Sequence, residues 1–205
     1  MVSSQEKFWE GDFGDNYILR NNSESLYPPN LRLFSEIINC MEINPVEWIE
    51  FGPNIGNNLK AVKTLLPDCK TIGVEINSTA AETLKKSGSC DLVINRSIFD
   101  LKEKHFKSDV SMTKGVLIHL NPEFIQDAYK VLYDSSRKYI LLIEYYNPSP
   151  VELNYRGNKD TLFKRDFAGE MMEKYPDLTL VKYGFRYHKD ITFPQDDLTW
   201  FLLKK

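Results

Sequence analysis

Apolar residues along the chain follow two spacings, one typical of amphipathic helices and the other of short buried strands. Residues 31–41 and 57–66 carry apolar side chains at every third or fourth position, which predicts two helices. Two more helices are predicted over 77–86 and 121–135, where an asparagine can cap each first turn. Five strand-length apolar segments alternate with these helices, at 46–51, 71–75, 92–94, 110–113 and 139–145.

This alternation predicts a parallel, doubly wound sheet with helices on both faces. It stops after Asn147, where a polar, proline-containing stretch leads to a short helix that Asp166 can cap. Residues 178–187 and 198–203 then read as two strands with no helix between them. We therefore expect an α/β fold with a Rossmann-like, seven-stranded sheet, mostly parallel but with an antiparallel C-terminal edge pair.

The expected organisation is an N-terminal aromatic arm or lid over residues 1–30 and a single domain over 31–205. The arm is rich in polar and aromatic residues and ends at Pro28-Pro29. An insertion at about 147–175, between the last parallel strand and the edge pair, is the expected wall of an acceptor pocket.

Length, charge and cysteine content narrow the class of protein. A chain of 205 residues can bury a large core in one domain. Its 26 basic and 29 acidic residues give a net charge of −3 without a basic cluster, which disfavours nucleic acid or an anionic membrane as partner. The three cysteines lack metal-binding spacing, and no apolar segment resembles a signal peptide or a membrane span. We therefore expect a cytoplasmic protein without a bound metal, whose oligomeric state stays open.

The segment after the first predicted strand contains the most informative pattern, Glu50-x-Gly52-x-x-x-Gly56. A glycine-rich turn between a strand and a helix binds nucleotide-like ligands at the carboxyl edge of such sheets. A dinucleotide motif needs a glycine where Asn54 stands, and no Gly-Lys-Ser/Thr phosphate loop follows. Glu75 ends the second strand, where an acid can accept hydrogen bonds from ribose hydroxyls. These features favour S-adenosylmethionine (SAM) over NAD; the alternative is a plain turn and a surface acid.

Residues 50–59, Glu-Phe-Gly-Pro-Asn-Ile-Gly-Asn-Asn-Leu, resemble the opening motif of class I SAM-dependent methyltransferases. Further segments along almost the whole chain are similar to the methylases associated with pseudaminic acid biosynthesis. The most specific of them are the aromatic N-terminus and the Arg-Asp-Phe and Gln-Asp-Asp segments. The similar segments are 8–21, 113–119, 144–148, 155–157, 162–170 and 193–200.

This resemblance implies an enzyme that transfers a methyl group from SAM to a small acceptor and releases S-adenosylhomocysteine. It also implies that the acceptor is a sugar or a nonulosonate-pathway metabolite like pseudaminic acid. Ser97 and Ile98 are expected beside the adenine, and Arg20 in the arm is expected to pair with the methionine carboxylate. The full set of expected cofactor-binding residues is Tyr17, Arg20, Glu50, Gly52, Asn54, Gly56, Glu75, Ile76, Ser97, Ile98, Lys114 and Val116.

Catalytic candidates lie in the segments that follow the fourth and fifth strands. His119 is the candidate base, because a neutral imidazole can take a proton from an acceptor hydroxyl. The alternative is a core histidine bonded to the backbone. Glu144 and Tyr146 are further candidates at the end of the fifth strand. The acceptor-binding candidates are Asn147, Arg156 and Arg165; the two arginines suit an acidic acceptor, unless they serve loop salt bridges.

Two other functions stay open at this point. The chain can be a noncatalytic SAM-binding partner in glycan biosynthesis, or a methyltransferase of another small metabolite or of a protein. Nucleic acid is disfavoured as acceptor, because no Asn-Pro-Pro-Tyr sequence follows the fourth strand. Production of S-adenosylhomocysteine separates an enzyme from a noncatalytic partner.

Overall fold

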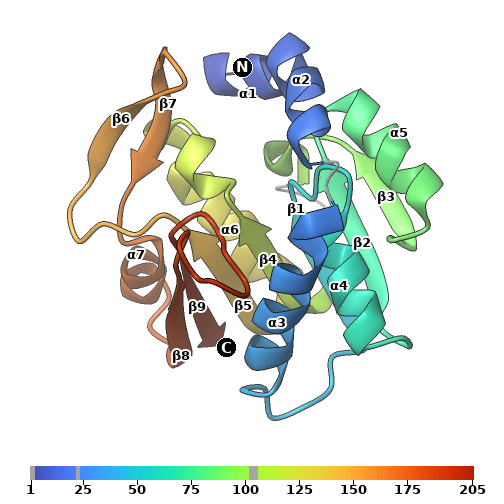
Figure 1. Cartoon of the computed structure of the whole chain (residues 1–205). Coiled ribbons are helices and arrows are strands. Elements are labelled where there is room, and N and C mark those ends of the chain that lie inside the picture. Colours follow the sequence, from blue (N-terminus) through green and yellow to red (C-terminus); the bar gives the residue numbers. More distant parts are fainter. Residues whose placement is uncertain (1–2, 22–23, 102–105) are drawn as a thin grey trace.

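The structure is a computed structural model that describes residues 3–21, 24–101 and 106–205, without the side chains at 19, 20, 159 and 160. Its centre is a seven-stranded sheet with the order β3-β2-β1-β4-β5-β9-β8 (Figure 1). The first five strands pair in parallel, and β9 and β8 pair antiparallel at one edge. The strands are β1 (Glu47–Phe51), β2 (Lys70–Glu75), β3 (Leu92–Asn95), β4 (Ser108–Lys114), β5 (Ser136–Glu144), β8 (Thr179–Arg186) and β9 (Leu198–Lys204). The expected fold class is therefore confirmed, including the antiparallel edge pair.

Helices cover both faces of this sheet. The helices α3 (Tyr27–Ile38), α4 (Asn57–Leu65) and α5 (Ser78–Ser87) pack on one face, and α6 (Ile125–Ser135) and α7 (Phe167–Lys174) pack on the other. Side chains of β5 alternate between the two cores: Leu141 and Ile143 join the first, and Ile140 and Leu142 join the second. A strand that is apolar at every position is buried on both faces, which explains the uninterrupted apolar run of the sequence.

The N-terminal segment, the expected arm or lid, is helical. It forms α1 (Ser4–Glu10), α2 (Asp12–Asn21) and the short 3-10 helix η1 (Glu24–Leu26). α3 begins at Tyr27, earlier than the spacing of apolar residues predicts, and holds Pro28 and Pro29 in its first turn. Proline is tolerated there because the first N–H groups of a helix have no partner within it.

The predicted insertion contains a hairpin that the sequence pattern does not reveal. The strands β6 (Val151–Tyr155) and β7 (Asn158–Lys164) pair antiparallel in a separate two-stranded sheet. Arg156 and Gly157 form its turn with φ of 51° and 83°, a left-handed pair that suits the twist of a hairpin. The side chain of Asp166 then caps α7, as predicted, by accepting the N–H of Gly169.

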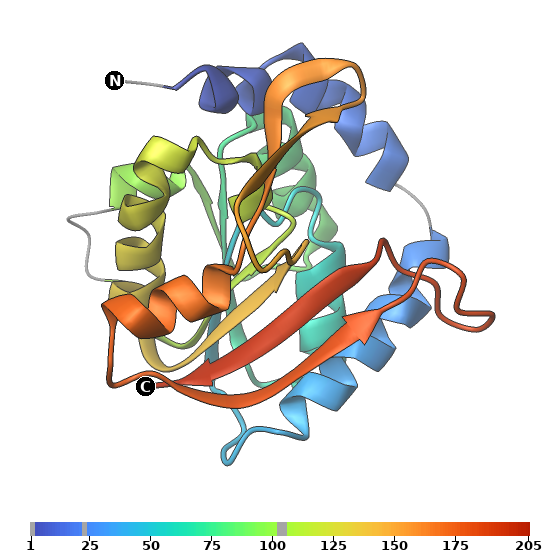
Figure 2. The same cartoon turned by 90° about the vertical axis from the view of Figure 1, so that its left-hand side faces the viewer.

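The hairpin and the N-terminal helices lie at the same end of the molecule (Figures 1 and 2). The rings of Phe13 on α2 and Tyr155 on β6 lie 6.2 Å apart, centroid to centroid. Three short 3-10 helices complete the fold: η2 (Ile98–Leu101), η3 (Leu117–His119) and η4 (Pro122–Phe124). Among the described residues, no helix has the length and apolar character needed to cross a membrane.

Candidate functional site

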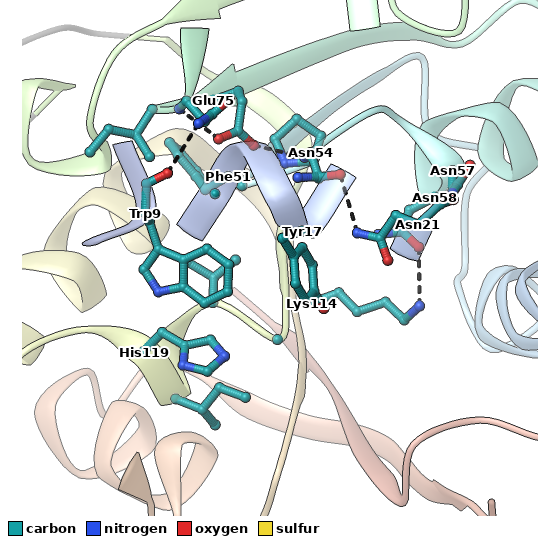
Figure 3. A pocket seen from close by; sticks show the side chains of 18 of the residues that line it. Trp9, Tyr17, Asn21, Phe51, Asn54, Asn57, Asn58, Glu75, Lys114 and His119 are labelled. Atoms are coloured by element: carbon teal, nitrogen blue, oxygen red, sulfur yellow. Dashed lines mark hydrogen bonds between the residues drawn. The ribbon is translucent and has the colours of Figure 1, made fainter. Parts of the chain in front are cut away.

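A cavity of about 260 Å³ lies beneath α1 and α2, at the carboxyl ends of the parallel strands (Figure 3). This size is close to the lower end of the range of small-molecule sites, roughly 300–1,000 Å³. Ligands of open α/β sheets bind at this edge, because the turns after the strands converge there. Nine of the expected cofactor-binding residues line the cavity. They are Gly52 and eight residues with side chains, Tyr17, Asn54, Glu75, Ile76, Ser97, Ile98, Lys114 and Val116.

The glycine-rich turn forms one wall of the cavity and is in the left-handed conformation at three positions. The φ angles are 73° at Gly52, 50° at Asn54 and 91° at Gly56. A Cβ at Gly52 would lie 2.5 Å from Cγ2 of Val116, and one at Gly56 would lie 2.3 Å from Cδ1 of Leu84. Gly52 therefore lets the first turn approach the segment after β4, whereas Gly56 lets α4 begin against α5 and does not itself line the cavity.

Glu75 ends β2 with its carboxylate held in a fixed position. Its Oε2 accepts the backbone N–H of Asn54 at 2.7 Å, and its Oε1 accepts that of Asn77 at 2.9 Å. Burial raises the pKa of this carboxyl, and the backbone N–H donors act in the opposite direction. Because each oxygen has a further lone pair, Glu75 can still accept two hydrogen bonds from a ligand in the cavity.

A buried polar network lies at the end of the cavity near α3 and α4. Lys114 donates to the side-chain oxygens of Asn30 and Asn58, at 2.9 and 3.2 Å, and Asn58 donates to Glu50 at 2.6 Å. Burial lowers the pKa of Lys114 and raises that of Glu50 to about 7, and each charge opposes the shift of the other. Glu50 does not line the cavity. It is connected to the cavity wall through Asn58 and Lys114, which do line it.

Aromatic rings from segments far apart in the sequence cover the opposite end of the cavity. Trp9 on α1 lies 5.2 Å from Tyr17 on α2 and 4.7 Å from the imidazole of His119, centroid to centroid. His119 lies 4.9 Å from Tyr155 of the hairpin. The N-terminal helices and the hairpin therefore meet over His119, and Figure 3 shows Trp9 next to both Tyr17 and His119.

His119 is 7% exposed, and its imidazole ring is fixed by a contact with the hairpin. Its Nδ1 lies 2.6 Å from the carbonyl oxygen of Thr161 in β7. A carbonyl only accepts, so Nδ1 carries the proton and Nε2 is left with a lone pair. Burial lowers the pKa of the imidazole to about 4. His119 is thus both a backbone-bonded, buried histidine and a lining residue of the cavity.

The other two catalytic candidates lie outside the cavity lining. The Glu144 carboxylate accepts the backbone N–H groups of Val116, Leu117 and Ile118 at 3.1, 3.2 and 3.4 Å. It therefore holds the turn that carries Val116 and His119. The ring of Tyr146 lies against Phe201, 5.9 Å between centroids, and its side chain is exposed.

The acceptor-binding candidates do not gather at one place. Arg165 is paired with Glu170 at 2.7 Å, and neither lines the cavity. The exposed guanidinium of Arg156 does not line the cavity but lies 5.4 Å from the centre of the ring of Tyr155, which does. Asn147 donates to the carbonyl oxygen of Ser149. The side chain of Arg20 lies outside the described part of the chain.

Several lining residues are not among the site residues that the sequence predicts. Glu6 and Asn21 come from the N-terminal helices, Asn30 from α3, and Gln195 from the loop between β8 and β9. Gln195 donates to Asn30 at 3.0 Å and has a buried Oε1 without a partner in the described residues. The Gln-Asp-Asp segment indicates Gln195 as a candidate site residue, but its position between two strands is equally typical of a hairpin turn.

The described residues contain no group of three or more His, Cys, Asp or Glu side chains placed to hold a metal ion. No protein-family model and no curated protein sequence matches the chain. Solved structures resemble it along almost its whole length.

Three of these structures, all of methyltransferases, define the fold class. The magnesium protoporphyrin IX methyltransferase of Synechocystis, crystallised with S-adenosylhomocysteine, aligns with a TM-score of 0.72 at 9% identity, over 98% of this chain and 97% of the other. The 1,6-didemethyltoxoflavin-N1-methyltransferase of Burkholderia thailandensis aligns with a TM-score of 0.70 at 10% identity, over 98% and 86%. The plantazolicin methyltransferase aligns with a TM-score of 0.67 at 14% identity, over 98% and 94%. The chain therefore has a Rossmann-like methyltransferase fold.

Proposed function

We propose that this protein is a SAM-dependent methyltransferase that acts on a small-molecule acceptor. The observation that carries the proposal is the cavity after β1, β2 and β4, whose wall contains the glycine turn and the Glu75 carboxylate that this turn holds in place. The three methyltransferases of similar fold support it, since each was crystallised with S-adenosylhomocysteine.

The side chains of the cavity fit this cofactor. Glu75 offers two acceptor positions for the ribose hydroxyls, and Ile76 and Ile98 offer apolar surface for a base. Lys114 offers a half-buried cation for the methionine carboxylate, and Gln195 has a buried acceptor without a partner in the described residues for the ammonium group. When bound, SAM supplies a methyl group on a sulfonium, which transfers to a nucleophile in line with the sulfur.

The protein contributes alignment and exclusion of water. Trp9 and Tyr17 close the cavity from above, and Tyr155 closes it from the hairpin, so α1 and α2 act as a lid. His119 presents the unprotonated Nε2 and takes a proton from a hydroxyl acceptor as the methyl group is transferred. Glu144 acts only through the backbone turn that it holds.

The finer proposal is that the acceptor is sugar-derived, as the resemblance to pseudaminic acid methylases implies. Tyr17, Tyr145, Tyr155 and Asp196 line the cavity and suit a molecule with several hydroxyl groups. Arg156, which contacts the lining residue Tyr155, is then the candidate for binding a carboxylate rather than Arg165, which is paired with Glu170. A cytoplasmic location is part of the same proposal.

Calorimetric titration with SAM tests cofactor binding. Glu75→Ala should weaken binding about 10- to 100-fold, because hydrogen bonds to a charged acceptor contribute about 1.5–3 kcal/mol. The control is Glu82→Ala, since that side chain is exposed on α5. Equal affinity in the wild type and the Glu75 variant would remove Glu75 from the site, and no binding at all would overturn the proposal.

Incubation of a nonulosonate-pathway metabolite extract with methyl-labelled SAM tests catalysis. Labelled product and S-adenosylhomocysteine are expected. Binding of SAM without turnover of any acceptor would favour the noncatalytic partner instead. If label appears only with metabolite extracts from other pathways, the result would contradict a sugar acceptor but would still support methyltransferase activity.

A further inference from the structure

The carboxylate of Glu6 lines the cavity although it belongs to the N-terminal helix, and the proposed reaction does not use it. Its side chain is 8% exposed. Oε2 accepts the backbone N–H and the hydroxyl of Ser3, at 2.8 and 3.0 Å. The backbone N–H of Glu6 donates in turn to the Ser3 hydroxyl oxygen at 3.1 Å, which completes the capping box of α1. Oε1 accepts the hydroxyl of Ser97 at 2.6 Å, from a residue 91 positions away. Glu6 thus connects α1 to the turn after β3.

Ser97 has no hydrogen left for a ligand in this arrangement. Its hydroxyl donates to Glu6 and accepts the backbone N–H of Phe99 at 3.2 Å, and its own N–H donates to Asp100 at 3.2 Å. An ionised carboxylate has about four acceptor positions. Three of those on Glu6 are used by described residues, and the fourth belongs to Oε1, next to Ser97 and Ile98 in the cavity wall.

We propose that Glu6 is the residue that recognises the 6-amino group of the cofactor's adenine. The inference rests on the proposed function, which puts the base beside Ser97 and Ile98. An ionised carboxylate accepts hydrogen bonds and cannot donate them, so it favours an amino group at this ring position and repels a carbonyl oxygen. Ser97 is then a positioning residue, which holds the carboxylate of Glu6 in place.

The same side chain joins the lid to the body of the protein. Without the contact between Glu6 and Ser97, α1 would keep the ring contacts of Trp9 but would lose this hydrogen bond to the turn after β3. Recognition of the base and closure of the N-terminal helices therefore depend on one carboxylate.

Binding of S-adenosylhomocysteine and of S-inosylhomocysteine, which carries a carbonyl oxygen at position 6, tests the proposal. The wild type should bind the adenosyl compound at least about tenfold more tightly, since a hydrogen bond to a charged group is gained in one case and lost in the other. Glu6→Gln keeps a capping-box side chain but presents N–H groups. It should lose this preference or reverse it toward the inosyl compound.

Glu10→Gln on the same helix is the matched control, because Glu10 is exposed and does not line the cavity. It should keep the wild-type ratio of affinities. Equal binding of both compounds by the wild type would overturn the proposal even if Glu6→Gln fails to fold. An unchanged ratio in a folded Glu6→Gln variant would overturn it as well. Failure of both compounds to bind would instead contradict SAM as the cofactor.

Discussion

The Nδ1 atom of His119 lies 2.6 Å from the carbonyl oxygen of Thr161, which connects the turn after β4 to the hairpin strand β7. This bond fixes the tautomer of the ring and leaves Nε2 as its acceptor atom. It also joins two segments that the sequence separates by 42 residues. The imidazole is held between this carbonyl and the rings of Trp9 and Tyr155, so it is both oriented and kept from water.

The first prediction concerns the pH dependence of stability. The pKa of His119 is lowered to about 4, below the ordinary value of 6.5, so the unfolded chain takes up a proton at a higher pH than the folded one. This contribution is fully present above pH 6.5 and is lost as the pH falls toward 4, by about 3 kcal/mol in total. The difference in unfolding free energy between wild type and His119→Gln, measured with urea, should therefore shrink over this range.

The matched control is His188→Gln. His188 is exposed beside Asp197, so its replacement should not reproduce the pH dependence of the His119 variant. A stability difference between wild type and His119→Gln that is the same at pH 4.5 and pH 7 would contradict the burial argument. The comparison uses differences between variants, because the raised pKa values of Glu50 and Glu144 change wild-type stability in the opposite direction.

Replacement of Glu144 tests a structural role against a chemical one. In Glu144→Gln, an amide NH₂ group replaces one of the two carboxylate oxygens that accept three backbone N–H groups, so two donors then face each other. We expect a loss of about 1–3 kcal/mol in the free energy of unfolding, measured with urea. Glu123→Gln, on the exposed side of η4, should cost far less. Unchanged stability combined with abolished kcat would make Glu144 a chemical group after all.

Alanine at Gly52 should affect both stability and the cofactor site. Gly52 and Gly88 have similar left-handed φ angles, 73° and 68°, so alanine at either site is strained by about 1–2 kcal/mol. Only the Gly52 variant adds a Cβ within 2.5 Å of Val116, whereas a Cβ at Gly88 meets nothing within 4 Å. We expect Gly52→Ala to unfold at lower urea concentration and to bind S-adenosylhomocysteine more weakly. Equal effects of the two variants would contradict this close approach.

The two arginines of the insertion should behave differently. Arg165→Gln breaks a partly buried pair with Glu170, which also accepts the hydroxyl of Tyr129 at 2.7 Å. It should lower Tm without a change in acceptor KM. Arg156→Gln should leave Tm unchanged and raise KM for an acidic acceptor, because Arg156 is exposed and contacts Tyr155 in the cavity wall. The opposite assignment of effects would return Arg165 to the acceptor site.

Local patterns in the sequence were sufficient to predict most of the fold. Apolar spacing located the parallel strands and the helices between them, because burial on one or both faces of an element leaves a periodic signal. The glycine turn and Glu75 were predictable as a pair for a similar reason. Both follow strand ends, and parallel strands bring their carboxyl ends to one edge of the sheet.

Tertiary structure decided which polar side chains enter the cavity. In the sequence, Glu75 and Glu144 are both acids at strand ends, yet Glu75 faces the cavity and Glu144 holds a backbone turn. Glu6 and Gln195 come from opposite ends of the chain, and no local pattern places either side chain in the cavity. A hydrogen bond between segments far apart in the sequence depends on how the whole chain packs. By itself, the sequence therefore determined the fold and the glycine turn with its acid, and the packing of the N-terminal helices and the hairpin decided the rest of the site.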